Sequence, residues 1–264
     1  MDPAILREQI YVPGRRGSLQ LELLAASRTV GRLPVRIPAS VTALVALLDS
    51  GRPVLVLQNL GIALIPVWHY AVVVGYLPAS DQFVLRSGSE SRRLVSRTRF
   101  DRSWRRADRW GIALFEPSEP AVGVTMLAYL DEAAAFESLG KPEIALQAYQ
   151  SAIEQWPLQA LPWVGLGNTL QVRGRPEAAV DAFTQALDLA PDNLVARNNL
   201  ADVLAALGCD TQALAVIDAA PPDVQRDSLY PRLLETRSEI ASVVEADHPS
   251  SSCRLNAAHN DTAP

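Results

Sequence analysis

An internal repeat in the second half of the chain limits what this sequence can fold into more than any other feature. Glycine recurs every 34 residues, at Gly140, Gly174 and Gly208. Two alanine columns keep the same spacing, and they consist of Ala145, Ala179 and Ala213, and of Ala152, Ala186 and Ala220. Such a period is typical of a solenoid, in which each repeat buries its apolar face against its neighbours.

Each repeat predicts two helices. The glycine ends the first helix by allowing a left-handed backbone, and the proline column, Pro157 and Pro191, stops the second. Three units, about 126–159, 160–193 and 194–227, are followed by a capping helix expected near 228–242. The sequence therefore predicts an all-α repeat domain over residues 124–242.

The second unit resembles the tetratricopeptide repeat family, through Trp163, Leu166, Gly167, Leu170, Ala179, Phe183, Ala186 and Pro191. The resemblance implies a groove, formed by the first helices, that binds a peptide or protein partner. Polar side chains there are candidates to hydrogen-bond a peptide backbone, or are only solvated helix positions: Asn168, Gln171, Asn198 and Asn199. The groove has no lysine, so we do not expect it to clamp a C-terminal carboxylate.

Composition excludes several kinds of chemistry. Two cysteines, Cys209 and Cys253, are too few for a disulfide framework or a four-ligand zinc site. Only one histidine, His69, lies outside the polar C-terminal end, so we expect no metal and no cofactor. The first residues contain no apolar secretory segment, which predicts a cytoplasmic protein as written. Loss of an upstream leader would instead make the protein exported or membrane-anchored.

The first half of the chain has a different pattern. Residues 1–117 carry sixteen arginines and nine acidic residues, whereas residues 118–264 carry eight basic and twenty acidic residues. Helical spacing at 18–30 and 40–50 is combined with short apolar runs at 33–38, 53–58, 69–76, 82–87 and 110–116, and with a hairpin turn at 77–81. This order predicts an α+β domain with an antiparallel sheet. Residues 243–264 lack periodicity, so we expect a disordered tail.

One motif in the first half could carry chemistry. His69 precedes the run AVVVGY, after a strand that ends in Gln58 and Asn59. With the surrounding segment, about 11–117, this motif resembles the papain-like cysteine peptidases of the double-glycine leader type, which process bacteriocin precursors. The resemblance implies a papain-like α+β domain in which His69 is the general base that activates a cysteine thiol.

Two departures from this family matter. The place of its third catalytic residue, an aspartate, falls near Ser87, which can accept a hydrogen bond from His69 but carries no charge; Asp81 lies in the turn, too early. No cysteine precedes His69, so the domain lacks its nucleophile helix, and neither Cys209 nor Cys253 is a credible substitute. We therefore expect no thiol-dependent peptide hydrolysis from the chain as written.

Two explanations of the missing cysteine remain open. The chain is either an N-terminally truncated peptidase or a pseudo-peptidase whose cleft only binds peptides. The alternative from another class is a non-enzymatic protein–protein interaction scaffold. On that view His69 is an ordinary core histidine, and Gln58 and Asn59 cap their strand rather than line a cleft.

An arginine cluster from Arg86 to Arg109 contains nine arginines and three acidic residues, with aromatic side chains among them. Such a combination can bind single-stranded nucleic acid. However, Phe100 and Trp104 are four residues apart, which indicates a short helix over 96–104 that docks by its aromatic face. The arginines then lie on its solvated side or face the acidic half, and we do not expect nucleic-acid binding.

Overall fold

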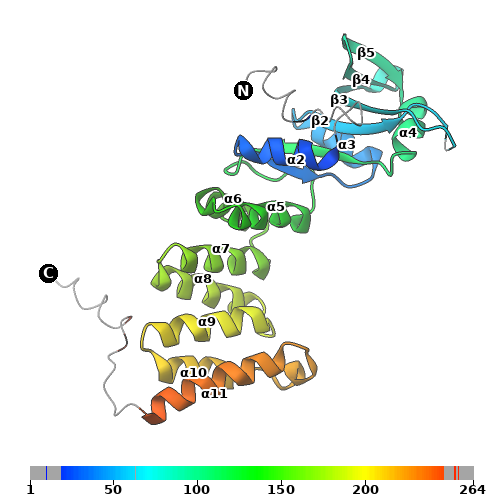
Figure 1. Cartoon of the computed structure of the whole chain (residues 1–264). Coiled ribbons are helices and arrows are strands. Elements are labelled where there is room, and N and C mark those ends of the chain that lie inside the picture. The colour runs from blue at the N-terminus through cyan, green and yellow to red at the C-terminus, as the bar shows by residue number, and fades with distance from the viewer. Residues whose placement is uncertain (1–9, 11–18, 63, 247–252, 254, 256–264) are drawn as a thin grey trace. The chain divides into compact units, whose positions relative to one another are not determined.

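The chain forms two compact units, Met1–Leu139 and Gly140–Pro264. The computed structural model describes residues 10, 19–62, 64–246, 253 and 255 (Figure 1). The boundary falls inside the segment that the sequence assigns to the first repeat. This is because helix α5 (Met126–Ser138), the first helix of that repeat, packs against strand β1 (Leu33–Arg36) of the first unit.

Within the described part of the first unit, six strands form one antiparallel sheet in the order β1-β6-β2-β3-β4-β5. The strands after β1 are β2 (Val54–Asn59), β3 (Trp68–Leu77), β4 (Gln82–Ser87), β5 (Glu90–Ser96) and β6 (Gly111–Phe115). A short 3-10 turn, η2 (Pro78–Ser80), closes the expected hairpin between β3 and β4. The α+β class with an antiparallel sheet is thus confirmed. Strand β5 is the one that the sequence did not predict.

Helices α2 (Gln20–Thr29) and α3 (Val41–Asp49) confirm the two helices expected before the main strands. The Ser40 hydroxyl accepts a hydrogen bond from the Ala43 backbone N–H at 3.0 Å and so caps α3. Helix α2 begins after Leu19 without a side-chain cap, and Ser18, the first residue of the predicted segment, lies outside the described residues.

Helix α4 (Arg97–Arg105) docks on the sheet through its aromatic face, as predicted. Phe100 and Trp104 are fully buried. The Phe100 ring lies 4.6 Å from the ring of Phe83 on β4 and 5.5 Å from the Trp104 ring, measured between centroids. The spacing of two aromatic residues therefore fixes which side of α4 meets the core, and several of its arginines are exposed.

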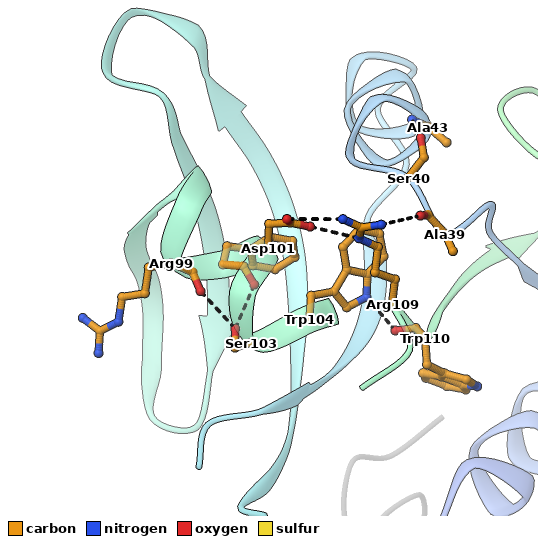
Figure 2. A network of polar contacts seen from close by, with 10 residues as sticks. Ala39, Ser40, Ala43, Arg99, Asp101, Ser103, Trp104, Arg109 and Trp110 are labelled. Carbon is orange, nitrogen blue, oxygen red and sulfur yellow. Dashed lines mark hydrogen bonds and ion pairs between the residues drawn. The ribbon is translucent and has the colours of Figure 1, made fainter. Parts of the chain in front are cut away.

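A polar network holds the turn that follows α4 (Figure 2). Asp108 and Arg109 both have left-handed backbone, with φ of 52° and 46°. The Arg109 guanidinium donates to the Asp101 carboxylate at 2.9 and 3.3 Å and to the Ala39 carbonyl at 3.4 Å. The Trp104 indole N–H donates to the Trp110 carbonyl at 2.9 Å. One arginine of the cluster, Arg109, is therefore a structural residue that fixes α4.

The second unit consists of consecutive helices that pack on their neighbours: α6 (Pro142–Gln155), α7 (Ala160–Val172), α8 (Pro176–Leu189), α9 (Leu194–Ala206), α10 (Asp210–Asp218) and α11 (Tyr230–Ala246). A 3-10 segment, η3 (Pro222–Arg226), precedes α11. The predicted glycines Gly140, Gly174 and Gly208 all have positive φ, between 66° and 73°. The helix pairs, their left-handed turns and the capping helix are as the 34-residue period predicts.

Close approach of the paired helices depends on a glycine inside α7. A Cβ atom built on Gly167 would lie 2.6 Å from Cε1 of Phe183, whose ring is fully buried on α8. Real Cβ atoms do not come this near to another atom, so the ring occupies space that only glycine leaves open. The glycine at this position of the tetratricopeptide pattern is therefore a packing requirement.

The C-terminal segment differs from expectation. Helix α11 continues to Ala246, into the segment predicted to be disordered. Cys253 of the same segment forms a disulfide with Cys209, which precedes α10, with 4.5 Å between the two Cα atoms. The prediction was wrong for these residues because contact across 44 positions in sequence leaves no periodic signal. The rest of the predicted tail, residues 247–252, 254 and 256–264, lies outside the described residues.

Candidate functional site

The two candidate catalytic residues of the first unit lie side by side. His69 is half-buried near the start of β3, and Ser87 is buried at the end of β4. The His69 Nε2 and Ser87 Oγ atoms are 2.8 Å apart, which is hydrogen-bond distance. Because β3 and β4 are antiparallel neighbours joined by a short hairpin, residues eighteen positions apart meet across the two strands.

The surroundings favour a neutral His69 imidazole. Burial lowers the pKa of His69 below its ordinary value of 6.5, and the nearby positive charge of Arg93 lowers this pKa further. Arg93 belongs to β5, the strand missing from the sequence prediction, so this electrostatic influence was not foreseen. A neutral imidazole has one N–H donor and one nitrogen lone pair, so His69 either donates a hydrogen bond to the Ser87 hydroxyl or accepts one from it.

The other potential partners of His69 are engaged elsewhere. Asp81 accepts a hydrogen bond from the Tyr76 hydroxyl at 2.6 Å in the hairpin. Both cysteine sulfurs, those of Cys209 and Cys253, belong to the disulfide of the second unit. The described residues therefore contain a histidine–serine pair but no thiol. They also contain no group of three or more metal-ligating side chains.

The polar end of β2 has a structural role. The Asn59 side-chain oxygen accepts from the backbone N–H groups of Gly61 and Val67, both at 3.0 Å, and so closes the β2–β3 loop. The Gln58 amide donates to the Ser103 hydroxyl at 2.7 Å and links β2 to α4. Of the two interpretations given for these residues, capping fits Asn59. Gln58 also lines a cavity of about 220 Å³ that Ser87 lines too.

A different cavity, of about 610 Å³, lies beside α2 in the same unit. Its walls are mainly apolar and include Leu23, Leu55, Val72 and Ile112. None of the residues predicted to be catalytic lines it. This cavity is therefore separate from the His69–Ser87 pair.

Two of the four candidate groove residues meet in the second unit. The Asn199 side-chain amide of α9 donates to the Asn168 side-chain oxygen of α7 at 2.8 Å. Both side chains are half-buried, and the two helices are the first helices of consecutive repeats. The residues are 31 positions apart, so the 34-residue columns of the sequence do not align them.

The other two candidates are placed differently. Asn198 donates to the Asp202 carboxylate at 2.9 Å and accepts from the Thr236 hydroxyl of α11 at 2.8 Å, so its amide joins the capping helix to α9. Gln171 is exposed on α7, three residues after Asn168. Burial raises the pKa of Asp202 above its usual value, against the lowering influence of Arg232.

Comparison with protein families identifies the repeats. Family models of the tetratricopeptide repeat match residues 130–193 and 173–235. The chain therefore contains tetratricopeptide repeats, as its period and its glycine, alanine and proline columns indicate. These matches cover no part of the region before residue 130.

Solved structures resemble this chain over less than half its length. The TPR2B domain of yeast Sti1, in a complex described as containing pHsp70, is 18% identical, covers 44% of this chain and 98% of its own, and has a TM-score of 0.40. The first TPR of Spaghetti (RPAP3), bound to an HSP90 peptide, is 12% identical to this chain, and the match covers 46% of this chain and 95% of that one with a TM-score of 0.41. The type III secretion chaperone SycD of Yersinia enterocolitica, in complex with a peptide of the translocator YopD, is 19% identical to this chain. The match covers 45% of this chain and 88% of that one with a TM-score of 0.38. No curated protein matches the chain.

The comparisons give no support to the papain-like, double-glycine leader resemblance of residues 1–117. For residues 1–117 the structure shows an antiparallel sheet and a distance of 2.8 Å between His69 Nε2 and Ser87 Oγ. None of the described helices has the length and apolar character of a membrane span.

Proposed function

We propose that this protein is a non-enzymatic interaction scaffold whose tetratricopeptide repeats bind an extended segment of a partner protein. The hydrogen-bonded pair of Asn168 and Asn199 carries the proposal. Their mutual bond uses one polar atom of each side-chain amide. Nδ2 of Asn168 is then left as a donor and Oδ1 of Asn199 as an acceptor, with no hydrogen-bond partner among the described residues.

This pair matches the chemistry of a peptide backbone. A peptide group offers one acceptor, its carbonyl oxygen, and one donor, its N–H. Neighbouring amides with one free donor and one free acceptor can satisfy both groups of an extended chain without regard to its side chains. Gln171, one turn further along α7 and exposed, extends the polar row.

The experiment is selection of a peptide from a displayed library on the full chain, followed by calorimetry with the selected peptide. Asn168→Ala and Asn199→Ala are each expected to weaken binding by roughly two- to tenfold, because each removes a hydrogen bond to the peptide. Asn198→Ala is the matched control. It removes the same type of side chain from α9, but that side chain bonds to α11, so affinity is expected to stay within twofold.

Two results would contradict this proposal. One is that no peptide is selected above background. The other is that the selected peptide binds wild type, Asn168→Ala and Asn199→Ala equally. Thermal unfolding of each variant, followed by circular dichroism, separates loss of binding from loss of the fold.

A second candidate function is peptide binding at the His69–Ser87 pair, as in a pseudo-peptidase. The supporting observation is the 2.8 Å distance between the His69 imidazole and the Ser87 hydroxyl. Fluorescence anisotropy with a labelled double-glycine peptide tests it. Binding without cleavage, reduced by His69→Ala and unchanged by Asn168→Ala, is the expected result. Binding that is indifferent to His69→Ala would remove this candidate, and turnover of the peptide would contradict a purely non-enzymatic role.

A further inference from the structure

The loop between β2 and β3 exposes an unusual amount of apolar surface. Its large apolar side chains are mostly solvent-exposed, with 89% of Leu64 and 69% of Ile65 accessible. The others that are exposed in this segment are Leu60, Ile62, Val67 and Trp68. In Figure 1 the segment projects beyond the sheet, next to α4. A contiguous apolar segment of this kind marks an interaction surface, because single exposed apolar residues are common but a row of them is not.

Hydrogen bonds of the backbone connect the two sides of the exposed loop. The Leu60 N–H donates to the Val67 carbonyl at 2.8 Å, and Ile62 and Ile65 exchange two bonds of 3.2 Å. Asn59, itself buried, closes the base of the loop. These bonds hold the two sides of the loop together, while its large apolar side chains are exposed.

Positive charge lies at the base of this loop. Arg99, Arg102 and Arg106 follow one another at three- and four-residue spacing along α4 and its C-terminal end, and they line the 220 Å³ cavity together with Arg93 of β5. Leu60 lines the same cavity. The Arg106 guanidinium also donates to the Gly61 carbonyl at 2.5 Å, which ties the arginine row to the loop.

These arginines are free to meet an external anion. Within the described residues, none of Arg99, Arg102 and Arg106 forms an ion pair, and Arg93 has only a long contact of 3.9 Å with Glu90. By contrast, Arg109 of the same cluster is paired with Asp101 and fixes the helix. Charge is therefore gathered on the side of α4 that adjoins the apolar loop.

From these two observations we infer that the β2–β3 loop and the arginine row form a docking surface for an anionic phospholipid bilayer. Apolar side chains of the loop enter the boundary between headgroups and acyl chains, and Trp68 at its edge has the amphipathic ring that favours this boundary. The arginines contact lipid phosphates. The loop is proposed as an anchor on one face of the bilayer. A protruding apolar loop with cations at its base fits a fluid anionic surface better than it fits a peptide, which requires a concave groove.

The test is co-sedimentation of the full chain with vesicles of phosphatidylcholine alone and of phosphatidylcholine mixed with phosphatidylserine. Binding to the anionic vesicles is expected, with much weaker binding to the neutral ones and at high salt. The double variant Leu64→Ser/Ile65→Ser is expected to bind at least tenfold more weakly, since it removes two insertable side chains. Arg99→Gln/Arg102→Gln is expected to lose roughly fivefold per arginine.

Matched controls come from the repeats. Leu158 and Val172 are apolar and 80% and 81% exposed, so Leu158→Ser/Val172→Ser removes equally accessible apolar surface elsewhere. This control is expected to bind vesicles like wild type. As a second readout, the tryptophan fluorescence of the chain is expected to shift to the blue on anionic vesicles, and this shift is expected to be absent in Trp68→Phe.

Three outcomes would overturn the inference: no binding to anionic vesicles, equal binding by the loop variant, or equal loss in the Leu158/Val172 control. If the wild type self-associates in analytical ultracentrifugation, does not bind vesicles, and loses self-association in the loop variant, the surface is a protein interface. Circular dichroism melting of each variant establishes that the exposed substitutions leave the fold intact.

Discussion

Replacing Gly167 with alanine tests whether the close contact between α7 and α8 determines the stability of the repeats. Two effects of opposite sign compete. Alanine in a helix interior stabilises by up to about 1 kcal/mol relative to glycine. The new methyl group, placed 2.6 Å from the Phe183 ring, overpacks a buried site, and overpacking costs about 1–3 kcal/mol. The steric conflict outweighs the gain in helix propensity, so we expect Gly167→Ala to lower the free energy of unfolding by up to about 2 kcal/mol.

The double variant Gly167→Ala/Phe183→Leu separates the steric conflict with the Phe183 ring from the effect of helix propensity. Leucine lacks the ring that the new methyl group meets. In the Phe183→Leu background, Gly167→Ala is therefore expected to be neutral or to stabilise by up to about 1 kcal/mol, which reverses the sign seen in the wild-type background. The assay is urea unfolding followed by the helical circular dichroism signal.

Gly174→Ala is the control for this cycle. Gly174 has no atom within 4 Å of a built Cβ, but its φ is +67°. Alanine there is expected to destabilise by about 1–2 kcal/mol through the backbone alone, equally in both backgrounds. The packing argument is refuted if Gly167→Ala stabilises the wild-type protein, or if its cost is the same with Phe183 and with leucine at that position.

Four further predictions concern other parts of the fold. The disulfide of Cys209 and Cys253 closes a loop of 44 residues, so Cys253→Ser or reduction is expected to lower the unfolding free energy by about 4 kcal/mol, measured as a lower denaturation midpoint in reductant. By NMR, His69 is expected to titrate below its ordinary pKa of 6.5, so its contribution to stability is complete above pH 6.5 and is lost as the pH falls toward the lowered pKa. Arg93→Gln is expected to raise the pKa of His69 only partly, since burial is the larger cause; a full return to 6.5 would contradict this order. Trp104→Ala, which empties a fully buried site, is expected to cost about 3–5 kcal/mol, and a loss below 1 kcal/mol would show that α4 is not docked as described.

The sequence predicted the repeats well because their structure is local. A glycine that must adopt positive φ and a proline that must stop a helix act within one turn of themselves, so their spacing translates directly into helix boundaries. The aromatic spacing of Phe100 and Trp104 predicted the docked face of α4 for the same reason. Interactions within three or four residues are visible in the sequence without knowledge of the fold.

Strand β5 escaped prediction because it lies at the edge of the sheet. Most of its side chains are exposed, so it lacks the apolar alternation that marks a half-buried strand, and its arginines resemble a solvated segment. The influence of Arg93 on His69 was missed as a consequence. The resemblance to the peptidase family did give Ser87 as the position nearest to a partner for His69, and the two side chains lie 2.8 Å apart.

Long-range pairings could not be predicted from periodicity. The Asn168–Asn199 bond spans 31 residues, one helical turn short of the repeat, and the disulfide spans 44. Neither separation matches a column of the sequence. Asn198 was assigned to the groove by its position on a first helix, but the capping helix, whose packing no repeat pattern specifies, engages its side chain.

The proposed lipid surface and the proposed peptide groove lie on different compact units, and the charge of the chain fits this division. Residues 1–139, the unit that holds the loop, carry sixteen basic and thirteen acidic groups, whereas residues 140–264 carry eight basic and sixteen acidic groups, so an anionic bilayer repels the second unit more than the first. Since the two surfaces share no residue, loop and groove substitutions are expected to act additively: Leu64→Ser/Ile65→Ser should leave peptide affinity unchanged, and Asn199→Ala should leave vesicle binding unchanged. With both proposed surfaces occupied, the scaffold is expected to concentrate its partner at the membrane.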